Sequence, residues 1–254
     1  MDVVVLVKYV PDPQGTPELG EDFLVEREGT EGALDPGDEF AVEAALRLVE
    51  QHGGEVTLVS MGPDVAMTAI RRGLSMGAHR GVLITDPVLR GADVLATARV
   101  LAAAVGRGPF DLVLAGVEST DGSTGTLPMA VAELLGVPAA TFARALEVAD
   151  GTVRIERQTE AGYDVVEAPL PAVATVTGSA AEPRYPTLKG IMQAKQKPVE
   201  QLDLSDLGLS AEQVAPTQRV TDVRPAPGKA AGEVVQGDDG AARIADLLAE
   251  AKVI

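Results

Sequence analysis

The sequence contains no cysteine and no tryptophan, only three tyrosines and four phenylalanines, and 21 basic residues against 38 acidic ones in 254 residues. The lack of cysteine excludes a disulfide framework, a thiol nucleophile, thiolate-bound zinc and a protein-bound iron–sulfur cluster. Any redox chemistry of this chain must therefore come from a bound cofactor.

The deficit of positive charge excludes another class of function. A formal net charge of -17 argues against nucleic acid as a partner, because binding to the phosphate backbone needs clustered Lys and Arg. No apolar stretch approaches the roughly 18 residues that a membrane helix needs. The first residues, with Asp2 and Lys8, make a poor signal peptide. We therefore expect a cytoplasmic protein that does not insert into a membrane.

Short apolar runs rich in β-branched residues predict strands that are buried on both faces of a parallel sheet. These runs cover residues 3–7, 56–60, 82–84 and 112–115. Amphipathic stretches of helical length alternate with them, over residues 39–51, 65–76, 92–105 and 127–135. The alternation predicts an α/β fold with a doubly wound, Rossmann-like parallel sheet, in which ligands bind at the carboxyl ends of the strands.

The pattern changes after Pro138. Turn residues separate short segments that predict hairpins, which either extend the first sheet or lie beside it. These segments are residues 145–148, 152–158, 163–168 and 172–175. From Gly178 onward prolines interrupt the pattern, residues 228–240 resemble a linker, and only residues 241–251 regain helical periodicity.

This change of pattern divides the chain in two. We expect a nucleotide-binding α/β domain with a hairpin extension over residues 1–177, and an extended C-terminal arm over residues 178–254. A tail so long and so poor in core residues is either disordered or laid over another molecule. A partner protein is the simpler explanation.

The loop after the fourth predicted strand is the most informative candidate site. Residues 115–126 are small and polar, so backbone N–H groups and hydroxyls at the start of a helix could form a phosphate cradle. The alternative is an ordinary loop in which Ser123 or Thr124 caps the helix. The loops 8–12 and 60–63 should end at the same edge of the sheet, so a nucleotide could bridge all three.

A catalytic constellation is not recognisable in the sequence. His52 and His79 have no acidic or histidine partners at metal-ligand spacing, and no Gly-x-Ser-x-Gly elbow occurs. The sequence therefore predicts binding chemistry without a metal and without catalysis.

The segment 182–197, with the sequence EPRYPTLKGIMQAKQK, resembles the partner-recognition loop and basic helix of the electron transfer flavoprotein (ETF) beta subunit. Further matches are Val7-Lys8, Asp35-Pro36 followed by residues 39–47, then residues 71–80 and 170–173. The resemblance therefore extends over nearly the whole chain.

This resemblance implies a heterodimer in which an alpha subunit holds most of the FAD and the C-terminal arm wraps that subunit. It implies an electron carrier, not an enzyme, that accepts electrons from acyl-CoA and other dehydrogenases and passes them to an ETF-quinone oxidoreductase. It also implies a fold like that of adenine-nucleotide hydrolases, with a structural AMP. The residues carried over to AMP binding are Leu6, Lys8, Asp35, Pro36, Gly37, Asp38, Met61, Asp121, Gly122, Ser123, Thr124, Gly125 and Thr126.

The resemblance also predicts a surface for partner recognition. Its residues are Arg184, Tyr185, Leu188, Ile191, Met192 and Lys195. Leu188 is expected to be an exposed apolar anchor for acyl-CoA dehydrogenases, in a turn held by Arg184 and Tyr185. For Lys195 and Lys197 a solvated helix face is the alternative.

Three other interpretations remain open at this stage. A stand-alone adenine-nucleotide sensor resembling universal stress proteins would account for the first 140 residues. A nucleotide hydrolase of related fold fits less well, because the loops lack a metal-binding acidic pair. Within the ETF family, a bifurcating type would hold a second FAD in place of AMP. Gly37 stands where related chains often have an aromatic residue, which leaves the contact of this subunit with the flavin open.

Overall fold

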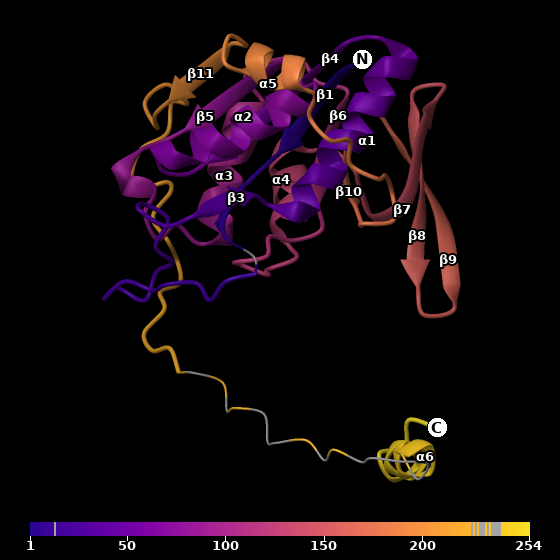
Figure 1. The fold of residues 1–254 in the computed structure, drawn as a ribbon. Helices are drawn as coiled ribbons and strands as arrows, with labels where there is room; N and C mark the ends of the chain where they lie inside the picture. Colours follow the sequence, from indigo (N-terminus) through magenta and orange to yellow (C-terminus); the bar gives the residue numbers. More distant parts are fainter. Residues whose placement is uncertain (13, 225, 227, 229–231, 233, 235–239) are drawn as a thin grey trace. The chain divides into compact units, whose positions relative to one another are not determined.

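The computed structural model describes residues 1–12, 14–224, 226, 228, 232, 234 and 240–254, and Figure 1 shows the fold. The chain forms two compact units, Met1–Thr221 and Asp222–Ile254. Within the described part of the chain, no helix is long and apolar enough to cross a bilayer.

A nine-stranded sheet in the order β11-β5-β4-β1-β6-β10-β7-β8-β9 forms the centre of the first unit. The strands from β11 to β7 run parallel, and β8 and β9 continue the sheet antiparallel. The strands of this sheet are β1 (Asp2–Leu6), β4 (Glu55–Met61), β5 (Arg80–Ile84), β6 (Leu112–Gly116), β7 (Ala139–Ala149), β8 (Thr152–Thr159), β9 (Gly162–Pro169), β10 (Ala172–Val176) and β11 (Val199–Leu202). A separate ribbon pairs β2 (Tyr9–Pro11) with β3 (Gly32–Leu34).

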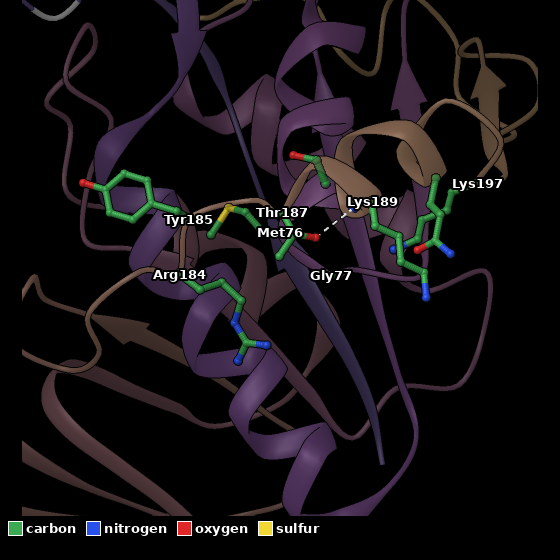
Figure 2. Close-up of a pocket in the computed structure, with 10 residues that line it drawn as sticks. Met76, Gly77, Arg184, Tyr185, Thr187, Lys189 and Lys197 are labelled. Carbon is green, nitrogen blue, oxygen red and sulfur yellow. Dashed lines mark hydrogen bonds between the residues drawn. The ribbon is translucent and has the colours of Figure 1, made fainter.

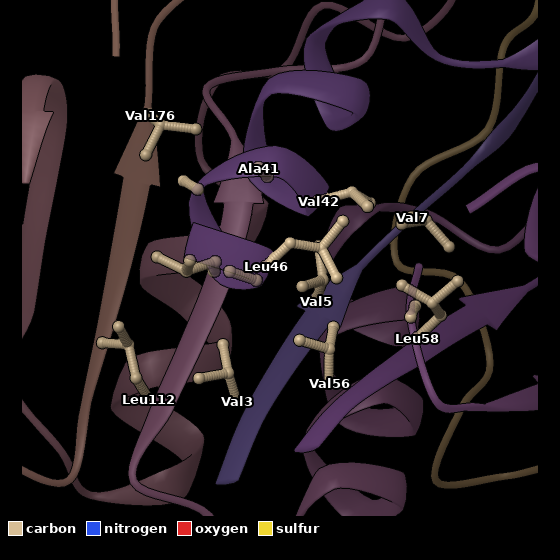
Figure 3. Close-up of a cluster of buried hydrophobic side chains, with 14 of the residues drawn as sticks. Val3, Val5, Val7, Ala41, Val42, Leu46, Val56, Leu58, Leu112 and Val176 are labelled. Atoms are coloured by element: carbon tan, nitrogen blue, oxygen red, sulfur yellow. The ribbon is translucent and has the colours of Figure 1, made fainter. Parts of the chain in front are cut away.

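Helices cover both faces of the sheet. The helices of the first unit are α1 (Pro36–His52), α2 (Met67–Met76), α3 (Val94–Val105), α4 (Leu127–Leu135) and α5 (Leu188–Ala194), with short 3-10 helices at Asp64–Ala66 and Pro87–Leu89; α6 (Gly240–Glu250) belongs to the second unit. Side chains of α1 and α2 join one buried cluster with the sheet, part of which Figure 3 shows around Val5 and Leu46. Side chains of α3 and α4 join a second cluster. The predicted doubly wound α/β fold is confirmed.

The path of the chain places a crevice at the centre of the sheet. From β1 the chain adds β4 and then β5 on one side, and it then returns to form β6 on the other side of β1. The direction of winding thus reverses between β1 and β6. Ligands of open α/β sheets bind at such a switch point, beyond the carboxyl ends of the strands. The loops that follow β1 and β6 are therefore the ones that matter for function.

The predicted hairpin region differs from the structure in one strand. Residues 172–175 belong to β10, an inner parallel strand between β6 and β7, and not to a hairpin. All five residues of β10 are buried, which is the reason that this run is apolar except for Thr175 and does not alternate. The other segments do form a meander, β7-β8-β9, which extends the main sheet and projects from it (Figure 1).

The predicted C-terminal arm is divided by the structure. Its first part, residues 178–221, belongs to the first unit: β11 pairs with β5 at the sheet edge, and Leu204 and Val214 are buried. The sequence did not predict this packing, because the apolar residues of 178–221 occur in runs too short to show a period. The predicted helix 241–251 is α6 of the second unit. Most of the predicted linker 228–240 lies outside the described residues.

Candidate functional site

Asp35 organises the first candidate site, at the switch point between β1 and β6. Its carboxylate is fully buried and caps α1, with Oδ1 accepting a hydrogen bond of 2.8 Å from the Gly37 N–H. Its Oδ2 accepts hydrogen bonds from the N–H and the hydroxyl of Thr120, at 2.7 and 2.9 Å. A single carboxylate therefore ties the start of α1 to the loop after β6.

Asp38 lies in the first turn of α1 and is also buried. Its Oδ2 accepts a hydrogen bond of 2.8 Å from the backbone N–H of Lys8, at the end of β1. Burial and the neighbouring Asp35 carboxylate raise the pKa of Asp38 to about 8, against the opposing effect of hydrogen bonds from the Lys8 and Gly116 backbones. Asp38 is therefore largely protonated at neutral pH.

Two cations meet at Asp121 on the outer side of this cluster. The Lys8 Nζ lies 2.6 Å from Asp121 Oδ1 and 3.1 Å from Ser119 Oγ, and the Arg27 guanidinium pairs with Asp121 Oδ2. Burial alone would raise the pKa of Asp121, but Lys8 and Arg27 hold it below its usual value. The result is an ionised carboxylate between two positive charges, at a sheet edge where ligands bind.

The second candidate site is the docking segment, which we define as residues 182–197. It contains α5, whose N-cap Thr187 accepts a hydrogen bond from the Gly190 N–H. Tyr185 is 90% exposed and Leu188 75% exposed, and Ile191 and Met192 are exposed as well. Contiguous exposed apolar residues of this kind mark interaction surfaces.

Arg184 fixes the start of the docking segment on α1. Its Nε lies 2.7 Å from Glu43 Oε2, and its Nη1 lies 2.5 Å from Glu50 Oε1. Glu43 is buried, and burial by itself would raise its pKa, but hydrogen bonds from Arg184 and Arg47 hold the pKa below its usual value.

The end of the segment is fixed on α2 by reciprocal hydrogen bonds. The Arg71 guanidinium donates to the carbonyl oxygens of Ala194 and Lys197, at 2.6 and 2.8 Å. The Lys197 Nζ donates to the carbonyls of Leu74 and Ala78, at 3.0 and 2.5 Å. These carbonyls belong to the C-terminal end of α2, where a positive charge is favourable.

Between these two attachments lies a shallow cavity of about 290 Å³, shown in Figure 2. It is lined by the end of α2, including Met76 and Gly77, and by residues of the docking segment. The approach of α5 to α2 is so close that a Cβ on Gly190 would lie 2.5 Å from the Ser75 carbonyl oxygen. Glycine is therefore required at this position for the segment to pack as it does.

Comparison with known proteins identifies the family. The family model described as "Electron transfer flavoprotein domain" matches residues 22–207, which is most of the chain. The chain belongs to the electron transfer flavoprotein family. Among curated relatives, the "Electron transfer flavoprotein subunit beta" of Mycobacterium leprae (strain TN) is 40% identical over 264 residues, covering 100% of this chain and 99% of the relative.

Two further relatives extend the comparison. The "Electron transfer flavoprotein subunit beta" of Bacillus subtilis (strain 168) is 35% identical over 258 residues, with all of both chains covered. The "Caffeyl-CoA reductase-Etf complex subunit CarD" of Acetobacterium woodii is 35% identical over 243 residues, covering 93% of this chain and 92% of the relative. These matches confirm the predicted resemblance to ETF beta subunits. They support electron transport in a flavoprotein complex with an alpha subunit as partner.

Lys8, Asp35, Asp38, Thr120 and Asp121 form what we call the switch-point cluster. Ser60 Oγ, beside the predicted ligand Met61, is buried and has no hydrogen-bond partner among the described residues, so it fits a polar group of a ligand or a water. In the loop after β6, Ser123 and Gly125 have positive φ angles of 44° and 60°. The N-cap residue of α4 is Thr126, and among the described residues no side chain caps it, so neither Ser123 nor Thr124 is the helix cap. Uncapped N–H groups at a helix start favour a phosphate.

The predicted nucleotide ligands of the ETF-family chain fall into three groups. The first group is linked by hydrogen bonds. The Lys8 backbone N–H donates to Asp38 and the Lys8 ammonium to Asp121, while Asp35 accepts from Thr120, the neighbour of Asp121 in the chain. Gly122 is joined to this group because its N–H donates to Ser119 Oγ. Leu6 and Met61 lie at the ends of β1 and β4, and their side chains pack into or against the second apolar cluster. Pro36 and Gly37 form the first turn of α1, and residues 123–126 form the loop before α4.

One prediction for the docking segment is wrong, and one alternative does not hold for Lys197. Tyr185 does not hold the turn, since its side chain is 90% exposed; the turn is held by Arg184, as predicted, together with Glu43. Lys197 is not on a solvated helix face, since its ammonium caps α2 and burial lowers its pKa. Lys195, the C-cap of α5, is exposed.

Several residues of both sites escaped the sequence analysis. Arg27 comes from the long loop between β2 and β3, and the only signal was an isolated basic residue in an acidic stretch. Thr120 and Ser119 lay inside the predicted loop but carried no special pattern. Glu43 was detectable in principle, because it is an acidic residue among the apolar positions of α1. Among the described residues, no group of three or more His, Asp or Glu side chains could hold a metal.

The protonation of Asp38 predicts a specific pH dependence. Its pKa is about 8 in the folded protein and close to the ordinary 3.8 when unfolded, so between these values the folded state binds the extra proton. Its contribution to the free energy of unfolding therefore falls as the pH rises from about 4 to about 8. Asp38→Asn cannot ionise at this position. We therefore expect the free energy of unfolding of the wild type to fall relative to that of the variant over this range.

This dependence is measured by chemical denaturation of both complexes at pH 5 and pH 8, at one protein concentration, because association contributes to the stability of a heterodimer. Parallel pH dependence of the two proteins would show that Asp38 is ionised in the folded state.

Proposed function

We propose that this chain is the beta subunit of a heterodimeric ETF that accepts electrons from acyl-CoA and other dehydrogenases and delivers them to an ETF-quinone oxidoreductase. We choose these partners because of the docking segment. Its apolar residues are exposed, while both of its ends are fixed to helices of the fold. A fixed apolar anchor on an acidic protein suits a small protein interface. We place this activity in the cytoplasm.

Leu188 is the proposed anchor for the dehydrogenase. It is the first residue of α5 and is surrounded by Tyr185, Ile191 and Met192, all exposed. Lys195, the exposed C-cap of the helix, supplies positive charge at the far border of this surface, whereas the charge of Arg184 is paired with Glu43 and Glu50. A small interface permits the fast release that a carrier serving several dehydrogenases requires.

We propose that the switch-point cluster holds an AMP of structural role. Lys8 and the loop 121–126 with the uncapped start of α4 would hold the phosphate, and the Leu6 backbone, residues 35–38 and Met61 would complete the site. Support comes from the two cations at Asp121, from the Ser60 hydroxyl, which has no hydrogen-bond partner in the part of the chain that the structure describes, and from the position of the cluster at the switch point. The FAD, held mainly by the alpha subunit, supplies the redox chemistry when bound. The role of this chain is to position partners and cofactor, as a carrier without bond-making chemistry of its own.

Co-expression with the alpha subunit tests the proposal. We expect a yellow 1:1 complex that is reduced by an acyl-CoA dehydrogenase and its substrate, and that releases one FAD and one AMP per heterodimer on denaturation. The released nucleotides are identified by mass spectrometry. Folded material that fails to associate with the alpha subunit would refute the proposal.

A second candidate assigns a second FAD to this subunit in place of AMP. One relative is named as a subunit of a caffeyl-CoA reductase-Etf complex, so the family includes complexes with a CoA-ester reductase. The same denaturation experiment separates the two candidates, because the bifurcating type releases two FAD per heterodimer and no AMP. A stand-alone nucleotide sensor would instead behave as a stable monomer that binds ATP reversibly. It would give the docking segment no purpose.

A further inference from the structure

We propose that Glu43 is a positioning residue for the docking segment: its buried carboxylate fixes the start of the segment, so that Leu188 is presented to the partner in one orientation. The inference rests on the proposed function of this segment. It assigns a role to a residue of α1 that does not itself reach the exposed surface.

Both oxygens of Glu43 are engaged with the segment or with a residue that holds it. Oε2 accepts hydrogen bonds from Arg184 Nε at 2.7 Å and from the Arg184 backbone N–H at 3.2 Å. Oε1 accepts from Arg184 Nη2 at 3.1 Å and from Arg47 Nε at 2.8 Å. The pair with Arg184 is thus bidentate, and such pairs constrain orientation as well as distance.

Glu43 also acts on the backbone just before Arg184. Arg47, which Glu43 holds from one helical turn away, donates from Nη2 to the carbonyl of Glu182 at 3.2 Å. The Glu43 carboxylate therefore holds the backbone at two positions, residue 184 by a direct hydrogen bond and residue 182 through Arg47. Leu188 follows only four residues later, so release of this start would let the anchor move.

The burial of Glu43 favours a positioning role over a purely stabilising one. A buried ion pair often adds nothing to the stability of a fold compared with well-packed apolar side chains, because removal of the charges from water is costly. What it provides here is a defined geometry between α1 and the segment. A surface that is already ordered loses less conformational entropy on binding. Glu50, the second partner of Arg184, is more than half exposed, and solvent screens its contribution.

The test compares two variants of the ETF heterodimer. Glu43→Gln keeps the size of the side chain but loses the charge and one acceptor oxygen. Glu39→Gln is the matched control: it lies on the same helix and removes the more exposed pair with Arg72, at 2.9 Å. Two readouts are used. One is amide hydrogen exchange of Arg184, Tyr185, Thr187 and Leu188, the residues of 183–188 that carry an amide hydrogen. The other is the KM and kcat of electron acceptance from an acyl-CoA dehydrogenase.

We expect Glu43→Gln to raise both the amide exchange rate, above all that of Arg184, whose N–H donates to Glu43, and the KM for the ETF complex about tenfold, with kcat and FAD per heterodimer unchanged. Glu39→Gln should change neither quantity. Unchanged exchange and KM in a flavin-loaded Glu43→Gln complex would overturn the proposal. So would a parallel loss of flavin and kcat at constant KM, since that indicates general destabilisation.

Where Glu43→Gln yields no complex, Arg184→Lys carries the same test, because it keeps the charge pair with Glu43 and loses the bidentate geometry. Wild-type complex that accepts no electrons from the dehydrogenase would refute the proposed function. The exchange measurement would then still decide whether Glu43 fixes the segment.

Discussion

Replacement of Asp35 by alanine is expected to lower the free energy of unfolding of the ETF complex by about 3 kcal/mol and to reduce the nucleotide retained by this subunit. The variant loses the cap of α1, which contributes about 1 kcal/mol. It also leaves the Thr120 N–H, 2.7 Å from the lost carboxylate oxygen, without its acceptor, which costs about 1–3 kcal/mol.

The nucleotide is affected because Asp35 holds together two parts of the proposed site. Without it the loop after β6 is no longer fixed to the start of α1. The measurement is chemical denaturation at one protein concentration, together with mass spectrometry of the nucleotides released per heterodimer.

Asp93→Ala provides the matched control for this prediction. Asp93 caps α3 through a hydrogen bond from the Ala96 N–H at 2.8 Å, and it also accepts hydrogen bonds from Thr217. The bonds from Thr217 are exposed, and Asp93 is not part of the proposed nucleotide site. We expect a loss of about 1 kcal/mol and unchanged nucleotide content. Equal effects of the two variants on stability and nucleotide content would show that Asp35 is only a helix cap.

The second large effect is expected for Leu188→Ala, which should raise the KM for electron acceptance from an acyl-CoA dehydrogenase about thirtyfold. A truncated anchor at the centre of a small interface typically costs about 2 kcal/mol or more of binding free energy. FAD content and stability should be unchanged, because the Leu188 side chain is 75% exposed and contributes little to the core.

Leu134→Ala serves as the control for the anchor, since Leu134 is a half-exposed leucine of α4, a helix of the opposite face. It should leave the KM unchanged. Stopped-flow measurement of flavin reduction over a range of ETF concentrations separates KM from kcat. A Leu188→Ala complex with wild-type KM would rule out the anchor role, and a rise in KM for Leu134→Ala would show that the effect is not specific to the docking segment.

The local pattern of the chain was sufficient for much of the central fold. The runs at residues 3–7 and 112–115 are apolar because helices cover both faces of these strands. Each segment alone therefore predicts its own burial. The same holds for the helix that starts after Asp35, whose cap and apolar spacing are local features. Periodicity missed β11, which is short and follows Pro198. It predicted the strand at residues 172–175 but not its place in the sheet, because the partners of β10 are remote in sequence.

For the candidate sites, the sequence likewise predicted the segments involved but not the contacts between them. The loop 115–126 and the segment 182–197 could be found from the sequence, because each carries its signal in consecutive residues. The contacts that give these segments their geometry join residues far apart in the chain, such as Lys8 with Asp121 and Glu43 with Arg184. No pattern in a single sequence specifies such pairs, since each partner alone is an ordinary charged residue.

The sequence by itself determined that this chain has a doubly wound α/β core, that redox chemistry must come from a cofactor, and that residues 182–197 resemble a recognition element. These properties depend on composition and on neighbouring residues. Only the tertiary structure decided that β10 lies inside the sheet, that Lys197 caps α2, and that Glu43 and Asp35 are buried carboxylates on which two sites are built. The reason is physical: burial and ion pairing arise when remote segments meet, and they are properties of the folded chain.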